Sequence, residues 1–293
     1  MNSRWFKSLI SAFIILCIPA AESQAQTIST AVGRGIQGSS GDGGSPTAAL
    51  LNLPSAVWSD TSGTLFIADT GNNLIRRVNA ARDSIVTFAG TGSAAFSGDG
   101  ANAISAALNA PAGVFVDSTG VVYIADTGNH RIRRIDGSGI IKTIAGKDTT
   151  AGLFIDDTLA TQATLSSPTA VFARGGFVYI ADTGNNRIRR ITVNNSDNSG
   201  FITTIAGKDT TAGLFIDDTL ATQATLNRPH GLYVDRSLNV FIADTNNHRI
   251  RKLSASDSVL TTLAGSEKAG VYGDGGLPSN AHLAFPTAVV VDT

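Results

Sequence analysis

Two kinds of ionisable side chain recur at fixed spacing, and they are the first candidates for chemistry. The recurring aspartates, each in the tetrapeptide Ile-Ala-Asp-Thr, are Asp69, Asp126, Asp182 and Asp244, and the basic pairs that follow are Arg76/Arg77, Arg133/Arg134, Arg189/Arg190 and Arg251/Lys252. Such carboxylates could bind a metal ion or substrate, and such arginines could follow a phosphate backbone. Because every copy carries both, we expect structural roles. The aspartates would accept backbone N–H groups two or three residues on, and the arginines would pack between repeats and pair with them.

Residues that differ between copies are better candidates for function. The residue after the proline that opens each repeat is Ser55, Ala112, Thr169, His230 or Thr287. Only His230, flanked by Arg228, carries a side chain capable of acid–base or metal chemistry. His130 and His248 stand where other copies have asparagine, so we expect them to be structural. The catalytic motifs G-x-S-x-G and H-E-x-x-H and a P-loop are absent.

Long connections between the repeats form the expected binding surface. Each carries an aspartate, namely Asp42, Asp99, Asp157, Asp218 and Asp274. Calcium is conceivable because it prefers hard oxygen ligands in flexible loops, but no loop has the D-x-D-x-D density of a dedicated site. Turn formation or helix capping is the favoured role. Two connections lie in identical stretches, 143–165 and 204–226, and offer Phe154 and Phe215 as exposed contacts.

The elements that position these residues follow from the repeat. The four aspartates are 57, 56 and 62 residues apart, a period typical of repeat architectures. Each unit contains four segments with the pattern of extended strands, which in the second unit are 113–117, 121–126, 131–135 and 140–145, and the first two are short apolar runs rich in Val, Ile, Phe and Tyr. Four antiparallel strands per unit, stacked unit on unit, predict an all-β fold of β-propeller type. Strand alternation places the connections on the same face as the Ile-Ala-Asp-Thr turns.

The first 25 residues predict export. Arg4 and Lys7 precede the short apolar run 9–19, and Ser23 and Ala25 provide small residues before a cleavage site. The run is too short for a permanent membrane span. The only cysteine, Cys17, lies inside it, so the mature chain is expected to contain none. We therefore predict a signal peptide over 1–25 and a secreted, periplasmic or cell-surface protein. A formal net charge of −1 gives no argument for nucleic acid.

With the recurring residues in view, the repeat resembles the NHL repeat. The resemblance rests on Gly-Asn-His-Arg-Ile-Arg-Arg at 128–134 after Val-Tyr-Ile-Ala-Asp, and it covers four complete units and the start of a fifth. The linking segments look like those of long-period bacterial NHL proteins. This family implies a six-bladed propeller that often serves as a docking surface for protein or RNA. Its relatives include receptor-kinase sensor domains and metal-dependent lyases or lactonases of the same fold.

Both ends of the chain are out of phase with the repeat. Residues 27–33 align with the fourth strand of a unit, and 288–292 align with the first strand of a fifth. We therefore expect a propeller over 27–293 that is incomplete at its C-terminus in this sequence, because an open arc would leave strand edges unpaired.

The function that the sequence favours is that of an exported, non-catalytic binding platform. It would recognise a protein or an extracellular glycan through Arg228, His230, Phe154, Phe215, Asp157 and Asp218, with no nucleic acid partner and no resident cofactor beyond a conceivable calcium ion. Two alternatives stay open. One is a metal-assisted lyase or lactonase that works around His230, although such a site needs several histidines or carboxylates. The other is the sensor region of a larger envelope protein.

Overall fold

The computed structural model describes residues 28–148, 155–193, 200–208, 217, 219–266 and 268–292. By its internal contacts the chain divides into residues 1–30 and 31–293, and the blades described below belong to the second unit. The predicted signal peptide and the candidates Phe154, Phe215 and Asp218 lie outside the described residues. Within the part described, no helix has the length and apolar content to cross a membrane.

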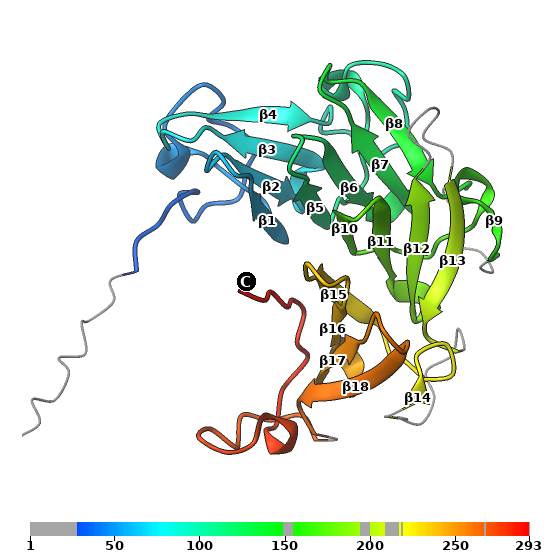
Figure 1. Cartoon of the computed structure of the whole chain (residues 1–293). Helices are drawn as coiled ribbons and strands as arrows, with labels where there is room; N and C mark the ends of the chain where they lie inside the picture. Colours follow the sequence, from blue (N-terminus) through cyan, green and yellow to red (C-terminus); the bar gives the residue numbers. More distant parts are fainter. Residues whose placement is uncertain are drawn as a thin grey trace, which may run out of the picture. The chain divides into compact units, whose positions relative to one another are not determined.

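Four antiparallel sheets, which we call blades 1 to 4, make up this unit (Figure 1). Blade 1 consists of Ala56–Ser59 (β1), Leu65–Asp69 (β2), Leu74–Val78 (β3) and Ile85–Ala89 (β4). Blade 2 consists of Gly113–Val116 (β5), Val122–Asp126 (β6), Arg131–Ile135 (β7) and Ile141–Ala145 (β8). Blade 3 contains Ala170–Arg174 (β10), Phe177–Asp182 (β11), Arg187–Val193 (β12) and Gly200–Ala206 (β13). Blade 4 contains Pro229–Val234 (β15), Val240–Asp244 (β16), Arg249–Leu253 (β17) and Val259–Ala264 (β18).

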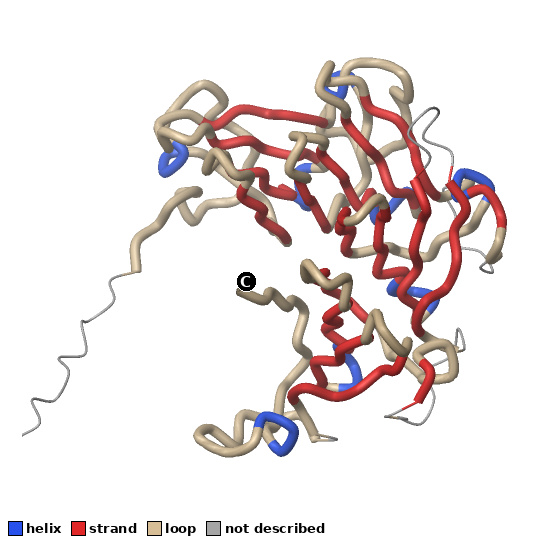
Figure 2. Tube along the Cα trace, viewed as in Figure 1, coloured by secondary structure: helices blue, strands red, loops and turns tan. Residues whose placement is uncertain are grey.

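These bounds confirm the all-β prediction, and in the second repeat each observed strand lies within one residue of the expected run. Figure 2 shows strands joined by loops and single helical turns. The described residues contain no α-helix, only 3-10 turns, which are Pro46–Ala48 (η1), Thr70–Asn72 (η2), Ala103–Ser105 (η3), Thr127–Asn129 (η4), Ala160–Gln162 (η5), Thr183–Asn185 (η6), Thr245–Asn247 (η7) and Pro278–Asn280 (η8). Four of these turns, η1, η3, η5 and η8, lie near the ends of connections.

The first strands of the blades lie side by side and form the centre of the unit (Figure 1). β1 contacts β5, β5 contacts β10, and β10 contacts β15. Each contributes one aromatic residue at the same register position, namely Trp58, Phe115, Phe172 and Tyr233. The last three are buried, and neighbouring rings lie 4.7, 4.2 and 5.1 Å apart between centroids. Burial of such large apolar rings is a principal source of stability between neighbouring blades.

Besides lying at the turn face, the long connections run along the outer edge of the blade that follows them, which was not predicted. They begin and end at that face, but between these points they hydrogen-bond to the fourth strand. Gly43 N donates to Ile85 O (2.8 Å), and Ile141 N donates to Ala101 O (3.0 Å). In blades 3 and 4 the contact becomes a short strand, Thr158–Leu159 (β9) on β13 and Thr219–Leu220 (β14) on β18. An edge covered in this way cannot pair with another chain.

The two partial repeats differ from complete blades. Residues 28–33, expected as a lone fourth strand, are in no strand, because a strand needs a hydrogen-bonded neighbour. Residues 288–292 are likewise in no strand. Even so, Val289 and Val291 pack against the core, and a side chain on Gly231 of β15 would meet Thr287 O at 2.5 Å. The chain therefore follows the course of a fifth first strand without forming its hydrogen-bond ladder.

Candidate functional site

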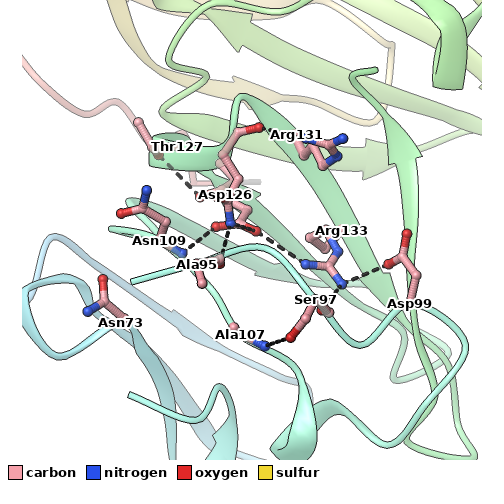
Figure 3. Close-up of polar contacts among 12 residues, drawn as sticks. Asn73, Ala95, Ser97, Asp99, Ala107, Asn109, Asp126, Thr127, Arg131 and Arg133 are labelled. Carbon is pink, nitrogen blue, oxygen red and sulfur yellow. Dashed lines mark hydrogen bonds and ion pairs between the residues drawn. The ribbon is translucent and has the colours of Figure 1, made fainter. Parts of the chain in front are cut away.

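The recurring aspartate is buried in the turn between the second and third strands, as Figure 3 shows for Asp126. Its Oδ1 accepts the backbone N–H of Asn109 (2.8 Å), and its Oδ2 accepts Asn129 Nδ2 (2.8 Å) and Arg133 Nη1 (3.3 Å). Arg133 then reaches outward, and its Nη2 donates to Asp99 Oδ1 at 2.7 Å. The side chains of Asp126 and Arg133 are fully buried, whereas Asp99 is partly exposed. The arginine therefore bridges two carboxylates, one in the turn and one in the connection.

The same three-residue network occurs in all four blades. The other members are Asp69–Arg76–Asp42, Asp182–Arg189–Asp156 and Asp244–Arg251–Asp217. In each blade the register between the third and fourth strands shifts just before this arginine. The first arginine of each pair is thus a structural residue, as predicted, and it ties the connection to the turn that it passes.

One detail of the prediction is wrong. The backbone N–H that binds Asp69 Oδ1 belongs to Asn52, 17 residues earlier, and not to a residue two or three positions on. The residues after the aspartate form a 3-10 turn whose last N–H, that of Asn73, already donates to Thr70 O. The carboxylate therefore turns back to the end of the connection, where the backbone still has an unused donor.

Burial controls the ionisation of these carboxyl groups. Loss of hydration raises the pKa of Asp126, Asp182 and Asp244, although hydrogen bonds and the arginine charge oppose the shift. In Asp42, burial also acts to raise the pKa, but hydrogen bonds from Thr87 and the charge of Arg76 outweigh it and the pKa is lowered. The aspartates of the turns, which we call the inner aspartates, have no contact with solvent, so their role is to hold the arginine in place.

Two further contacts join each blade to the next, and neither was predicted from the sequence. The threonine of Ile-Ala-Asp-Thr donates to the carbonyl of the proline that opens the next blade, at 2.7 Å in every case: Thr70 to Pro111, Thr127 to Pro168, Thr183 to Pro229 and Thr245 to Pro286. The sequence did contain a signal for this contact, because a threonine that recurs in all four turns indicates that its hydroxyl has the same partner in each repeat.

The second contact explains why histidine and asparagine alternate in the turn. Asn73 Oδ1 accepts Ala110 N (2.9 Å), and His130 Nδ1 accepts Ser167 N (2.8 Å) in the equivalent place. His248 Nδ1 does the same for Phe285 N at 3.2 Å. Both side chains thus supply one acceptor to the next blade, which confirms that the two histidines are structural. Burial and the charge of Arg131 lower the pKa of His130, which favours the neutral ring that can accept.

His230 lies at the start of β15 and is half-buried. Its carbonyl accepts Thr169 Oγ1 (2.7 Å), and its pKa is lowered, first by burial and also by the charge of Arg228. Arg228 is exposed, and its backbone N–H donates to Asn186 Oδ1 at 2.7 Å. Across the described ranges, no three His, Cys, Asp or Glu side chains come together in a way that could hold a metal ion. The structure thus places His230 and Arg228 near each other, and among the described residues His230 belongs to no such metal-binding cluster.

The alignment of Asp157 with the aspartates of the other connections needs a correction. The residue equivalent to Asp42 and Asp99 is its neighbour Asp156, whose Oδ1 binds Arg189 Nη2 at 2.7 Å. Asp157 is exposed, has a φ of 55°, and donates its backbone N–H to Ile202 O at 2.9 Å. In blade 4 the equivalent residue is likewise Asp217, and not Asp218. A carboxylate paired with a buried arginine is a poor calcium ligand, because its charge is already neutralised.

A groove of about 530 Å³ opens at the opposite end of the blades, where the first strands of blades 1, 2 and 3 finish. Its charged residues are Asp60, Asp117, Arg134 and Arg174, and its aromatic residues are Trp58, Phe115, Tyr123 and Phe177. No part of this groove was predicted. The available signal was the replacement, in the third repeat alone, of the aspartate that ends the first strand by Arg174.

Comparison with known proteins supports the assignment of the repeat. Residues 226–253 match the NHL repeat, and residues 81–153 match the teneurin NHL domain. Mouse teneurin-4 is 30% identical over 248 residues, covering 76% of this chain and 8% of that protein. The chloroplastic protein SUPPRESSOR OF QUENCHING 1 of Arabidopsis thaliana is 27% identical over 267 residues, covering 87% of this chain and 25% of that protein. The chain thus spans a quarter or less of the length of these relatives.

Solved structures share the fold at low sequence identity. An auxiliary nutrient binding protein from Bacteroides ovatus superposes with a TM-score of 0.59 at 16% identity, covering 83% of this chain and 55% of that one. A second protein so described, from Bacteroides thetaiotaomicron, gives a TM-score of 0.53 at 14% identity, covering 86% and 67%. At such identities the likeness concerns the arrangement of blades alone.

Proposed function

We propose that this chain, whose repeats are NHL repeats, is an exported platform that binds a protein or an extracellular glycan and catalyses no reaction on it. Recognition then belongs to the connections between blades. The recurring aspartates and the first arginine of each recurring pair belong to the frame, because both side chains are fully buried in all four blades. A rigid frame with variable connections is a common basis for recognition in repeat proteins.

The observation that carries the proposal is the duplicated connection. The stretches 143–165 and 204–226 are identical in sequence and are held by matching contacts on adjacent blades. Lys147 N donates to Ala163 O (2.9 Å), and Lys208 N donates to Ala224 O (2.8 Å). Residues within each copy also form the short edge strand, β9 or β14. The two copies are therefore offered at equivalent places, one blade apart.

Exposed apolar side chains at these edge strands favour a protein as the partner. Leu159 of β9 is 40% exposed and Leu220 of β14 is 52% exposed, and Phe201, which pairs with Leu159, is 59% exposed. Apolar and aromatic groups of this kind form the centre of protein interfaces. The same leucine is thus offered twice, beside Phe201 in blade 3 and beside Val259 in blade 4. Two such copies suit a partner with repeated units, because binding at the first raises the effective concentration at the second.

The proposal is tested with the substitutions Leu159→Asp and Leu220→Asp, made singly and together in the full chain. Envelope proteins retained by the immobilised chain would be identified and purified, and their affinities measured by surface plasmon resonance. We expect either single change to weaken apparent affinity by roughly 10²-fold, the size of a lost avidity gain, and the double change to abolish binding.

Leu263→Asp is the matched control, since Leu263 is 40% exposed on β18 outside the duplicated stretch and should leave the affinity unchanged. If the single variants bind as tightly as the parent chain, or if the leucine in one copy carries all of the affinity, recognition through two equivalent patches is wrong.

A further inference from the structure

We propose that the groove at the ends of β1, β5 and β10 binds a short neutral oligosaccharide. This site lies at the opposite end of the blades from the Ile-Ala-Asp-Thr turns and is separate from the duplicated connections. It is lined by three consecutive blades and has a volume of about 530 Å³. That is within the range of small-ligand pockets, which are roughly 300–1,000 Å³.

The aromatic core of the unit reaches the surface in this groove. Trp58 packs on Phe115 with ring centroids 4.7 Å apart and meets Phe172 edge-on at 5.6 Å. Phe115 and Phe172 are buried, but Trp58 is half-buried and lines the groove. The neighbours thus fix the orientation of Trp58 and leave part of its ring open. A fixed, partly open indole is a suitable surface for the apolar C–H face of a sugar ring.

At the groove, the third repeat departs from the sequence pattern of the others, because it has Arg174 where they have an aspartate. In blades 1 and 2 the equivalent residues, Asp60 and Asp117, close the turn after the first strand. Asp60 Oδ1 accepts Ser62 N (2.8 Å) and Thr64 N (2.9 Å), and Asp117 Oδ1 accepts Thr119 N (2.8 Å) and Val121 N (3.1 Å).

Blade 3 closes the same turn differently. It uses Gly175 and Gly176, with φ of 64° and 79°, so no capping carboxylate is needed and the position is open to another residue. The guanidinium of Arg174 is held in place there. Its Nη1 donates to Val234 O, and its Cζ lies 5.2 and 5.7 Å from the ring centroids of Phe172 and Tyr233. One bond to a carbonyl uses one of five N–H donors, so the group retains donors for a ligand.

The balance of charge in the groove selects the class of ligand. Arg134 and Arg174 contribute two positive charges, and Asp60 and Asp117 contribute two negative charges. The two carboxylates would repel an anion, and the two guanidinium groups would repel a cation, so the groove favours neither kind of ligand. Sugar hydroxyls both donate and accept, and therefore suit a ring of fixed donors and acceptors. Beside the half-buried Trp58 ring, this combination points to a neutral saccharide.

Tryptophan fluorescence tests the proposal directly. The chain contains two tryptophans, Trp5 and Trp58, so a Trp5→Phe version of the full chain reports on the groove alone. Maltotriose, cellotriose and chitotriose are the neutral probes, trigalacturonate is the anionic probe, and trilysine is the cationic probe. We expect at least one neutral trisaccharide to change the emission saturably at up to millimolar concentration, and the charged probes to leave it unchanged.

Two variants locate the effect. Arg174→Ala should weaken binding of the neutral probe by roughly tenfold, because a charged donor is lost, while Arg236→Ala should not. Arg236 is exposed in the equivalent turn of blade 4 and does not line the groove. Thr61→Tyr, a change at an exposed turn residue, should block the groove without disturbing the fold and abolish the response.

The assignment is overturned if no neutral probe gives a saturable change, if only trigalacturonate or trilysine does, or if neutral binding persists in both the Arg174→Ala and Thr61→Tyr chains. None of these outcomes bears on the duplicated connections, because Leu159 and Leu220 are not part of this groove. Failure of the groove and failure of the proposed function are therefore separable.

Discussion

The two ends of the blades use the same residue types in opposite ways. At the turn end, Asp126 and Arg133 are fully buried. They hydrogen-bond to each other, and Arg133 also hydrogen-bonds to Asp99 of the connection. At the groove end, the carboxylate of Asp117 caps one hairpin turn, and the guanidinium of Arg174 donates one hydrogen bond to the carbonyl of Val234. Both residues line the groove. An aspartate–arginine pair that recurs in every blade thus belongs to the architecture, whereas one exception to the pattern marks the stronger candidate for recognition.

The difference follows from what each end must do. The turn end joins each blade to the next through hydrogen bonds at fixed geometry, so a substitution there disturbs two blades at once. The turns at the groove end close individual hairpins, and either a capping aspartate or a pair of glycines serves, as Asp117 and Gly175–Gly176 demonstrate. Sequence can therefore vary at the groove end at little cost to the fold.

The largest expected effect comes from replacing two adjacent arginines by alanine, one at a time. Arg133→Ala leaves Asp126 buried without its counter-charge, and we expect the free energy of unfolding to fall by about 3–5 kcal/mol. Arg134→Ala, at the next residue, removes a half-exposed side chain from the groove and should cost less than about 1 kcal/mol. Urea denaturation followed by circular dichroism measures both. Equal losses would show that the two ends do not differ in the way described.

A smaller effect is expected from the inter-blade hydroxyl. Thr127→Val removes the donor to Pro168 O while keeping the shape of the side chain, so a buried carbonyl loses its partner. We expect a loss of about 1–3 kcal/mol. Thr61→Val, at the exposed turn of the groove end, is the control and should be neutral within about 0.5 kcal/mol. The same urea denaturation distinguishes the two variants, and a neutral Thr127→Val would remove this hydroxyl from the architecture.

The smallest effect concerns pH and compares His130 with Asn73 in the same role. The pKa of His130 is lowered in the folded chain, so the folded state binds fewer protons than the unfolded state between that value and about 6.5. Stability is therefore full above about pH 6.5 and is lost as the pH falls through this window, because a protonated Nδ1 cannot accept from Ser167 N.

His130→Asn should remove that part of the pH dependence, with a difference of about 1 kcal/mol or less at the acid end. Unfolding free energies of both chains at pH 7.5 and pH 5 provide the measurement, and His282→Asn, outside the turns, is the control. A parallel pH dependence in the parent and His130→Asn chains would contradict the acceptor role of Nδ1.

The sequence alone predicted the local elements well. The period of the Ile-Ala-Asp-Thr stretches, the alternation of apolar runs with Gly and Asp, and the Asn/His exchange in the turn all concern short segments. Their conformation is set by nearby residues, so the strands of the second repeat, the four blades and the structural role of His130 were predictable. The pairing of the first arginines with the aspartates was also predictable, because both recur at one spacing.

Tertiary structure decided which distant residues meet. Whether Asp156 or Asp157 reaches Arg189 depends on how the connection wraps the outer edge of the next blade, and no local pattern distinguishes two adjacent aspartates. The partner of Asp69, 17 residues back, and the groove lined by three blades depend on the same packing. Such contacts join segments far apart in the chain, so their identity follows from the stacking of the blades and not from the propensities of any one stretch.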